Sequence, residues 1–167
     1  MKNEIHLRLM EPEDIEEIYD LENSSDLWRH TLSGGPRSRR MITDYVLNAT
    51  GDMAVDCQAR FVIEVEGNIV GAVDLTAYDA VHQRAELGIA VKSDYRRRGY
   101  AAAAIRQLLD YCRNTLLLHQ VYALVLDDNN PSVSLFCKLG FQPCALLPQW
   151  YRTPDGFQDV QFFVFFL

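Results

Sequence analysis

The sequence lacks the residue spacings by which proteins usually hold a metal ion or form a thiol redox pair. Its four cysteines include no CxxC pair, and its four histidines fit no HExxH pattern. We therefore expect no metal site. Three of the cysteines stand in apolar stretches, so we expect reduced thiols packed in the core, as in a cytosolic protein.

The chain also has no excess of positive charge and no apolar run long enough to cross a membrane. It has 16 Lys and Arg residues against 23 Asp and Glu residues, for a net charge of -7. This balance argues against a nucleic-acid partner, which would need a broad basic face. Residues 1–10 lack the continuous apolar core of a signal peptide, and the apolar segment 162–167 is too short to span a bilayer. We expect a cytoplasmic protein without a membrane partner.

What the chain does contain is the composition of an ordinary globular domain. It has 167 residues, 49% of them hydrophobic and 23% charged, which suffices for one hydrophobic core. No repeat, linker or low-complexity segment divides it. We therefore expect a single domain over residues 1–167.

Hydrophobic periodicity predicts a mixture of strands and helices. Strands are expected at residues 5–9, 60–66, 69–78, 84–91, 121–126, 141–150 and 157–167, and helices from Pro12, over 37–48, over 101–117 and over 131–140. The strand, helix, strand order between residues 84 and 126 predicts a parallel crossover. A hairpin turn is expected at Gly67-Asn68, and Gly71 inside the next strand predicts a bulge or a close backbone contact.

The segment most informative about function follows the strand expected at residues 84–91. It gathers Arg96, Arg97, Arg98 and Gly99 at the start of the next helix. Backbone N–H groups at a helix N-terminus are unpaired, the helix dipole is positive there, and glycine permits a close approach of the backbone. The segment therefore predicts a polyphosphate site. The nucleotide motif GxxxxGK[ST] is absent, and the glycine spacing does not fit a dinucleotide-binding turn.

A second segment downstream narrows the ligand. Residues 129–141 read NNPSVSLFCKLGF. It follows the segment RRRGYA at residues 96–101. The two motifs in this order resemble those of the GNAT superfamily of acyl-CoA-dependent N-acetyltransferases. The chain is most similar to the branch that holds spermidine acetyltransferases and ribosomal-protein N-terminal acetyltransferases. The resemblance implies an α/β (α+β) fold, with a mixed, mostly antiparallel central sheet, a splayed parallel strand pair and flanking helices.

The resemblance also implies acetyl-CoA as the cosubstrate and indicates how it would be held. Backbone groups of residues 89–91 would pair with the pantetheine amides like an added strand, and N–H groups of residues 97–101 would hold the pyrophosphate. Asn129 would bond the pantetheine arm, and the helix from Pro131 would flank the thioester. The implied cofactor-binding residues are Ile89, Ala90, Val91, Arg96, Arg97, Arg98, Gly99, Tyr100, Ala101, Asn129, Ser132, Phe136 and Lys138.

Acetyl transfer needs a neutral amine nitrogen, and Glu86 is the best-placed acid–base candidate, on the strand beside the cofactor. Its carboxylate either accepts a proton from the amine, or contacts the substrate ammonium, or forms an ion pair. Many family members carry a tyrosine at the position of Phe136, and its hydroxyl protonates the leaving sulfur. Phenylalanine cannot do so, although water can supply that proton to a thiolate with a reference pKa of about 8.5. We assign no general acid.

The resemblance implies acetyl transfer to a primary amine, with a polyamine such as spermidine as the leading acceptor. A protein N-terminus as acceptor, or a silent acyl-CoA-binding sensor, is the alternative. Acceptor contacts are expected from residues 23–35, the helix from Arg37 and residues 148–156. Glu22, Asp26 and Asp52 either attract a polyamine or lie solvated at the surface, and Trp28, Trp150 and Tyr151 either line an amine pocket or pack in the core. The oligomeric state, a homo-oligomer included, is left open.

Overall fold

The computed structural model describes residues 4–28, 35–153 and 155–167, apart from the side chains of Asp26 and Trp28. The strands in these ranges are β1 (His6–Leu9), β2 (Ala59–Val65), β3 (Asn68–Asp79), β4 (Arg84–Val91), β5 (Gln120–Leu126), β6 (Gln142–Thr153) and β7 (Gly156–Phe166). The α-helices are α1 (Ile15–Glu22), α2 (Ser25–Trp28), α3 (Arg39–Asn48), α4 (Met53–Asp56), α5 (Tyr100–Asn114) and α6 (Asn130–Lys138). The predicted order of elements is confirmed, with two short helices, α2 and α4, that the periodicity does not predict.

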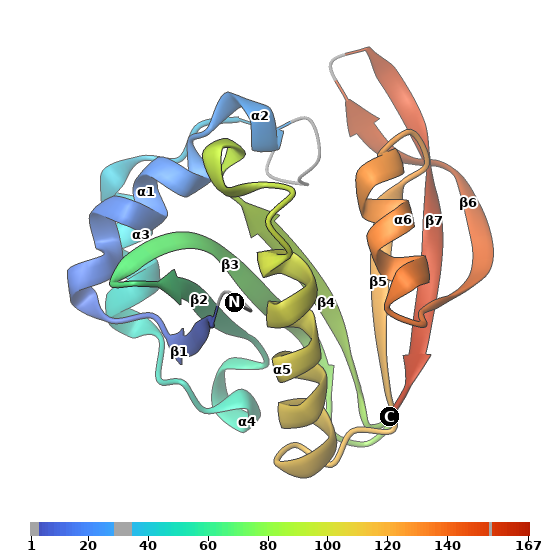
Figure 1. Ribbon diagram of the computed structural model, residues 1–167, viewed down its shortest axis with the longest axis horizontal. Helices are drawn as coiled ribbons and strands as arrows, with labels where there is room; N and C mark the ends of the chain where they lie inside the picture. Colours follow the sequence, from blue (N-terminus) through green and yellow to red (C-terminus); the bar gives the residue numbers. More distant parts are fainter. Residues whose placement is uncertain (1–3, 29–34, 154) are drawn as a thin grey trace.

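These strands form one sheet in the order β1-β2-β3-β4-β5-β7-β6. Every neighbouring pair is antiparallel except β4 and β5. The parallel pair is short, because it joins only residues 84–86 to residues 120–122. Beyond Glu86 the two strands separate, as Figure 1 shows. The expected fold class, a mostly antiparallel sheet with a splayed parallel pair and flanking helices, is confirmed.

The two faces of the sheet carry different side chains. In Figure 1, α5 lies over β3 and β4, and α6 lies over β5 and β7. Phe61, Val73 and Leu87 belong to the apolar core that includes α5. Because side chains alternate along a strand, Arg60 and Asp74, which are paired across β2 and β3, face the opposite side with Glu86. A cavity on that side is lined by residues of α1 and α3, and its wall mixes charged residues with apolar ones such as Met41 and Ile42.

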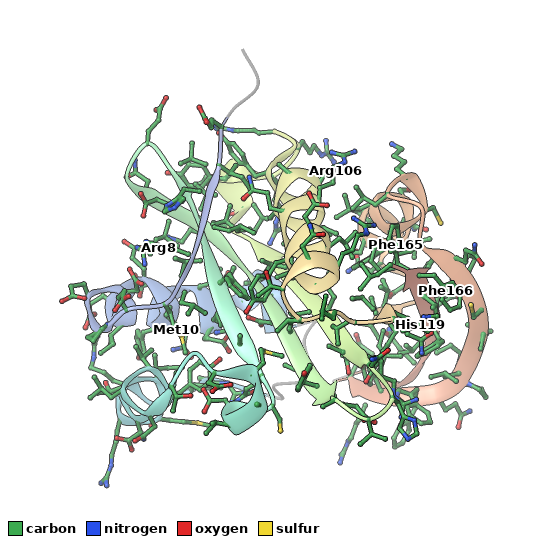
Figure 2. All side chains as sticks on the ribbon, turned by 90° about the horizontal axis from the view of Figure 1, so that it is seen from below. Arg8, Met10, Arg106, His119, Phe165 and Phe166 are labelled. Atoms are coloured by element: carbon green, nitrogen blue, oxygen red, sulfur yellow. The ribbon has the colours of Figure 1, made fainter. Side chains whose placement is uncertain are left out.

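Helix α5 is shorter than its sequence pattern predicts. Its buried face includes Ile105, Leu108 and Cys112, each at most 1% exposed, whereas Arg106 points away from the sheet (Figure 2). The expected helix over 101–117 ends at Asn114. Leu117 takes a left-handed φ of 52° that a helix excludes, because the chain must reverse there to enter the sheet as β5.

Two smaller expectations are also corrected. The turn between β2 and β3 lies at Glu66 and Gly67, one residue early, and both residues have the positive φ, 50° and 78°, that a two-residue hairpin turn requires. Among the four free cysteines only Cys112 is in the core, so the expectation of core thiols is wrong for the other three, Cys57, Cys137 and Cys144. These three thiols are exposed, and which face of its element each one occupies is set by the folded chain.

Gly71 confirms both readings of a glycine inside a strand. The register between β2 and β3 shifts opposite it, so that β3 carries one extra residue as a bulge. A Cβ built on Gly71 would lie 2.3 Å from the carbonyl oxygen of Ala90 on β4. The glycine therefore permits β3 and β4 to approach at the part of β4 where it separates from β5.

Substitution of Gly71 by alanine is expected to destabilise the protein by about 2 kcal/mol, because β3 or β4 must shift to relieve the backbone clash. Gly88 is the matched control on β4, since a Cβ there would meet only the Cβ of Asp74 at 3.8 Å. We expect G88A to unfold at nearly the wild-type urea concentration. Equal midpoints for G71A and G88A would contradict the close contact.

Candidate functional site

A cavity of about 250 Å³ opens where β4 and β5 separate, and we call it the central cleft. It brings together residues from distant parts of the chain, among them Glu22 of α1, Arg60 of β2, Asp74 of β3 and Tyr151 of β6. The sequence-predicted residues that line it are Glu86, Ile89, Ala90, Asn129, Ser132 and Phe136. The arginine segment and Lys138 do not line it; Lys138 is exposed at the C-terminal end of α6.

Among the described strands, none pairs with the edge of β4 that faces the cleft. Residues 87–91 pair with β3 on one side, whereas the pairing with β5 ends at Glu86. Such an edge can accept an extended chain of amides as an added strand, which is how a pantetheine arm would lie there. The Arg96 side chain braces the end of this edge, since its Nε donates to the Val91 carbonyl oxygen at 2.9 Å.

The loop between β4 and α5 is shaped for an anion. Arg97 and Gly99 have positive φ, 61° and 86°, and Gly99 is the N-cap of α5. Within the described ranges, the first N–H of this helix that donates to the backbone is that of Ala103, to the Gly99 oxygen at 3.1 Å. The preceding N–H groups therefore remain available for a pyrophosphate. Tyr100 contributes only its backbone here, because its side chain is buried in the core.

At the other wall of the cleft, Asn129 caps α6. Its Oδ1 accepts a hydrogen bond from the Ser132 N–H at 3.3 Å, which leaves its Nδ2 for a ligand. Phe136, one turn later, is 3% exposed and stacks on Phe163 with ring centroids 5.9 Å apart. Its ring lines the cleft but offers no proton. The wall that would flank the thioester is therefore apolar at position 136.

Glu86 is a half-buried carboxylate without an internal partner. No hydrogen bond or ion pair to its side chain forms anywhere in residues 4–28, 35–153 and 155–167, so the ion-pair reading is not supported. Burial raises its pKa above the usual glutamate range. A carboxylate of this kind is a stronger base than an exposed one, and it can also attract an ammonium group. Both of these roles stay open on the geometry alone.

The sequence did not point to the ionic network beside Glu86. Asp74 accepts two hydrogen bonds from Arg60, from Nε and Nη2 at 2.8 Å each, and Glu22 accepts one from its Nη1 at 2.6 Å. Glu22 also accepts from the Nε of Arg37 at 3.2 Å. Glu22 is thus a paired member of the cleft wall rather than solvated surface. The signal that could have found the network is a charged residue, Arg60 and Asp74, within each of two mainly apolar strands.

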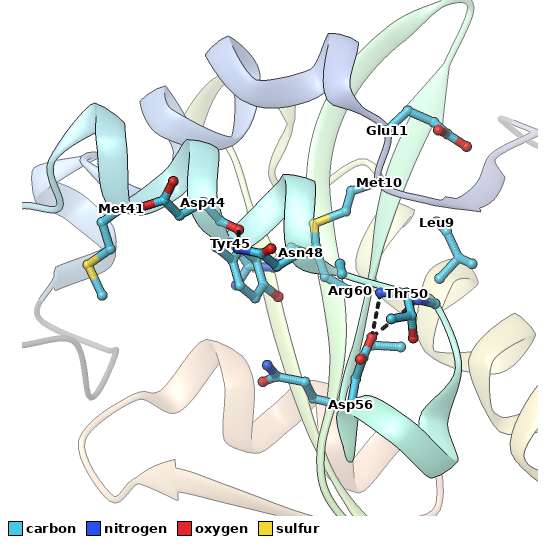
Figure 3. A pocket seen from close by; sticks show the side chains of 14 residues that line it. Leu9, Met10, Glu11, Met41, Asp44, Tyr45, Asn48, Thr50, Asp56 and Arg60 are labelled. Atoms are coloured by element: carbon cyan, nitrogen blue, oxygen red, sulfur yellow. Dashed lines mark hydrogen bonds between the residues drawn. The ribbon is translucent and has the colours of Figure 1, made fainter.

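Arg60 also borders a larger cavity of about 510 Å³, shown in Figure 3. There the Asp56 carboxylate accepts hydrogen bonds from the N–H groups of Thr50 and Gly51, at 2.8 and 3.2 Å. Asp52 caps α4 by accepting from the Ala54 N–H at 2.8 Å, so it is a helix cap outside the cleft. This second cavity lacks the residues that the sequence predicts for catalysis.

The remaining candidates for acceptor contacts differ in their placement. Tyr151 lines the central cleft, whereas Trp150 is 56% exposed. The side chains of Asp26 and Trp28, and residues 29–34 of the expected acceptor loop, lie outside the described residues. In the part that is described, no group of three His, Cys, Asp or Glu side chains could hold a metal ion. No helix there is long and apolar enough to cross a membrane.

Comparison with known proteins agrees with this geometry. Residues 4–142 match the acetyltransferase (GNAT) domain. Spermidine N(1)-acetyltransferase of Escherichia coli strain K12 is 28% identical over 137 residues, which cover 82% of this chain and 72% of the relative. The crystal structure of spermidine N-acetyltransferase from Vibrio cholerae in complex with CoA and spermine has a TM-score of 0.90 at 24% identity, covering 97% and 95% of the two chains.

A dodecameric structure of the Vibrio cholerae enzyme gives a TM-score of 0.83 at 25% identity, covering 97% of this chain and 93% of that one. The structural neighbours therefore share the fold that the sequence predicts, and the matched domain extends from β1 to the start of β6. The open edge of β4, the geometry of the loop before α5 and the family match agree with one another. The chain belongs to the GNAT acetyltransferase family.

Proposed function

We propose that the chain acts as one acetyltransferase domain over residues 1–167 and transfers the acetyl group of acetyl-CoA to a primary amine of a polyamine such as spermidine. The observation that carries the proposal is the half-buried, unpaired carboxylate of Glu86 in the central cleft, beside the free edge of β4. The spermidine acetyltransferases among its relatives support the choice of acceptor.

In this proposal acetyl-CoA lies along β4. The backbone of residues 89–91 pairs with its amides, and the N–H groups of residues 97–101 with the Arg96, Arg97 and Arg98 side chains hold its phosphates. Asn129 Nδ2 donates to the pantetheine arm, and Ser132 and Phe136 flank the thioester. Lys138 is left out of the site, because it is exposed outside the cleft.

Glu86 prepares the acceptor for attack. An alkylammonium with a pKa of about 10.4 is almost entirely protonated at neutral pH, so the reaction needs a group that removes a proton. Burial raises the pKa of Glu86 and thereby makes its carboxylate a better base. A backbone N–H near Ile89 can polarise the thioester carbonyl as an oxyanion hole does.

The charge of the cleft favours a cationic acceptor. Its wall carries the carboxylates of Glu22, Asp74 and Glu86 against the guanidinium of Arg60. Glu22 and Asp74 are bonded to Arg60, but carboxylate oxygens accept more than one hydrogen bond. A molecule with several ammonium groups can therefore contact Glu86 and the carboxylates of Glu22 and Asp74 at the same time.

The decisive experiment measures CoA release from acetyl-CoA with spermidine, spermine and peptides with free N-termini. Turnover of a polyamine, with a rate that falls at high salt, is the expected result. Turnover of peptides alone would instead identify a protein N-terminal acetyltransferase. Binding of acetyl-CoA without turnover of any amine would identify a sensor.

We place the activity in the cytoplasm, because free cysteines belong to a reducing compartment, and cell fractionation would test this.

We expect self-association through the outer hairpin of the sheet. β6 is a long edge strand, and Leu146, Trp150 and Phe157 on β6 and β7 are each more than half exposed, at 53%, 56% and 64%. The dodecamer of the Vibrio relative is consistent with a second copy as the cover. Light scattering should give a mass above the 19.1 kDa monomer, and W150E/F157E should lower it. V81E, at an 85% exposed site outside the hairpin, is the control; a monomeric wild type would contradict the expectation.

A further inference from the structure

The chain carries a hydroxyl group in the cleft that can replace the one missing at position 136. The side chains with a hydroxyl that line the central cleft are Thr76, Ser132 and Tyr151. A phenol is far more acidic than an aliphatic alcohol, so Tyr151 is the strongest proton donor of the three. We propose that the Tyr151 hydroxyl protonates the departing sulfur of CoA. This inference rests on the proposed acetyl transfer, and it assigns the residue that completes it.

An irregularity in β6 directs Tyr151 into the cleft. Leu147 pairs with Val160, but the next paired residue on β6 is Tyr151, opposite Gln158. β6 therefore contains two more residues than β7 between these pairs. Bulges of this kind redirect side chains and are frequent beside active sites. Here Trp150 is 56% exposed, whereas its neighbour Tyr151 is half-buried and lines the cleft.

The bulge is held by a specific contact. Gln149 has a left-handed φ of 49°, a conformation that costs energy in a residue other than glycine. Its N–H donates to the Asp159 Oδ1 at 2.8 Å, which fixes this conformation from β7. Asp159 is therefore a positioning residue for Tyr151.

Tyr151 is also electrostatically coupled to Glu86. Burial, the negative charge of Glu86 and the nearby Tyr122 together raise the pKa of Tyr151 to about 12. The phenol is thus protonated at neutral pH, as a proton donor must be. Burial likewise raises the pKa of a thiol, as it does for Cys112, to about 12. A thiolate formed in the partly buried cleft is likewise more basic than in water, which reduces the pKa mismatch with the phenol.

The proton balance of the step is closed. The amine nitrogen forms its bond to the acetyl carbon while the bond from that carbon to sulfur breaks. Tyr151 gives its hydroxyl proton to the sulfur, and CoA leaves as the thiol. Glu86 passes the first proton of the ammonium to solvent, and after the attack the nitrogen releases its surplus proton to the Tyr151 oxygen. No further reactant is required.

The test is Tyr151→Phe, with Tyr122→Phe as the matched control, because Tyr122 also lies near Glu86 but does not line the cleft. We expect Y151F to lower kcat by about 100-fold with the KM for acetyl-CoA unchanged, a loss typical of a general acid. Y122F should stay within about threefold of wild type. Adding Phe136→Tyr to Y151F should raise kcat at least about tenfold above that of Y151F, since α6 then supplies the hydroxyl. A Y151F enzyme that keeps more than half of its kcat, or changes only the KM for the amine, overturns the proposal.

A second measurement needs no turnover. Spectrophotometric titration of the phenols in wild type and Y151F gives the pKa of Tyr151 by difference, and E86Q should shift that pKa downward. An unshifted value would show that the two side chains are not coupled, and would overturn the arrangement. If the wild type acetylates an amine other than a polyamine, the proposed acceptor fails, but the Y151F comparison proceeds with that amine.

Discussion

Replacing Glu86 by glutamine is expected to lower kcat/KM for the amine by about 100- to 1,000-fold at pH 7, the range of a lost general base. Glutamine keeps the shape of the side chain but accepts no proton, and it removes the charge that attracts the ammonium. The KM for acetyl-CoA should change little, because the proposed cofactor contacts lie on residues 89–101 and on α6 with its cap, and not on Glu86. Steady-state rates with both substrates varied measure the effect. E66Q, at an exposed position in the β2–β3 turn, should behave as wild type.

The pH profile distinguishes a base from a simple ammonium contact. Glu86 works as a base only when it is ionised, and burial raises its pKa. The acidic limb of kcat/KM in the wild type should therefore lie above the usual glutamate range. E86Q should lose that limb along with the rate. A variant that keeps the limb at reduced rate would assign the base to another group.

The raised pKa of Glu86 also predicts that E86Q loses rate without losing stability. A raised pKa means that the folded protein holds this proton more tightly than the unfolded chain does, so ionisation of Glu86 lowers stability as pH rises through the interval between the two pKa values. Glutamine does not ionise. Thermal unfolding of E86Q at pH 7 should therefore occur at or above the wild-type temperature, and the difference should vanish below the usual pKa of glutamate.

The fold was predictable wherever local pattern determines it. β4 begins and ends where the apolar run predicts, and Gly71 lies at a close backbone contact, because alternation and the missing side chain are written in the sequence itself. The end of α5 was not predictable in the same way. Its apolar stripe continues to Leu116, but the chain must turn at Leu117 to reach β5, and tertiary geometry overrides the periodicity there.

The candidate site likewise has a part that the sequence predicts and a part that it does not. The loop expected to bind an anion is one continuous segment, so its place before α5 was predictable from the sequence. The Arg60 network joins residues 38 positions apart in the sequence, and Tyr151 lines the same cleft as Glu86 from a strand whose register shifts next to it. Contacts of that kind depend on the register of the whole sheet, and no local pattern encodes them.

The Arg60 network yields the second large effect. In Arg60→Met the carboxylates of Asp74 and Glu22 lose their shared cation, and their side chains are only 26% and 18% exposed. Asp74 loses both of its bonds to Arg60, while Glu22 keeps its bond to Arg37. Weakening the pairing of these partly buried charges should cost about 3 kcal/mol, which for a chain of this length lowers Tm by roughly 6–12 °C. Calorimetry measures this directly. Arg40→Met is the control. The Arg40 side chain is 91% exposed and pairs with Asp44 at the surface, so its loss should leave Tm unchanged.

A double variant separates the unpaired charge from the lost packing of Arg60, whose guanidinium lies 5.5 Å from the centre of the Tyr45 ring. Adding Asp74→Leu to Arg60→Met removes the carboxylate with two bonds to Arg60, while Glu22 keeps its bond to Arg37. Because an apolar replacement of a buried ion pair is close to neutral, most of the Tm should return. The double variant should nevertheless bind a polyamine more weakly than wild type, with a raised KM, since one acidic wall of the cleft is gone. Recovery of stability without recovery of KM would show that the network shapes the acceptor site; recovery of both would show that it serves only the fold.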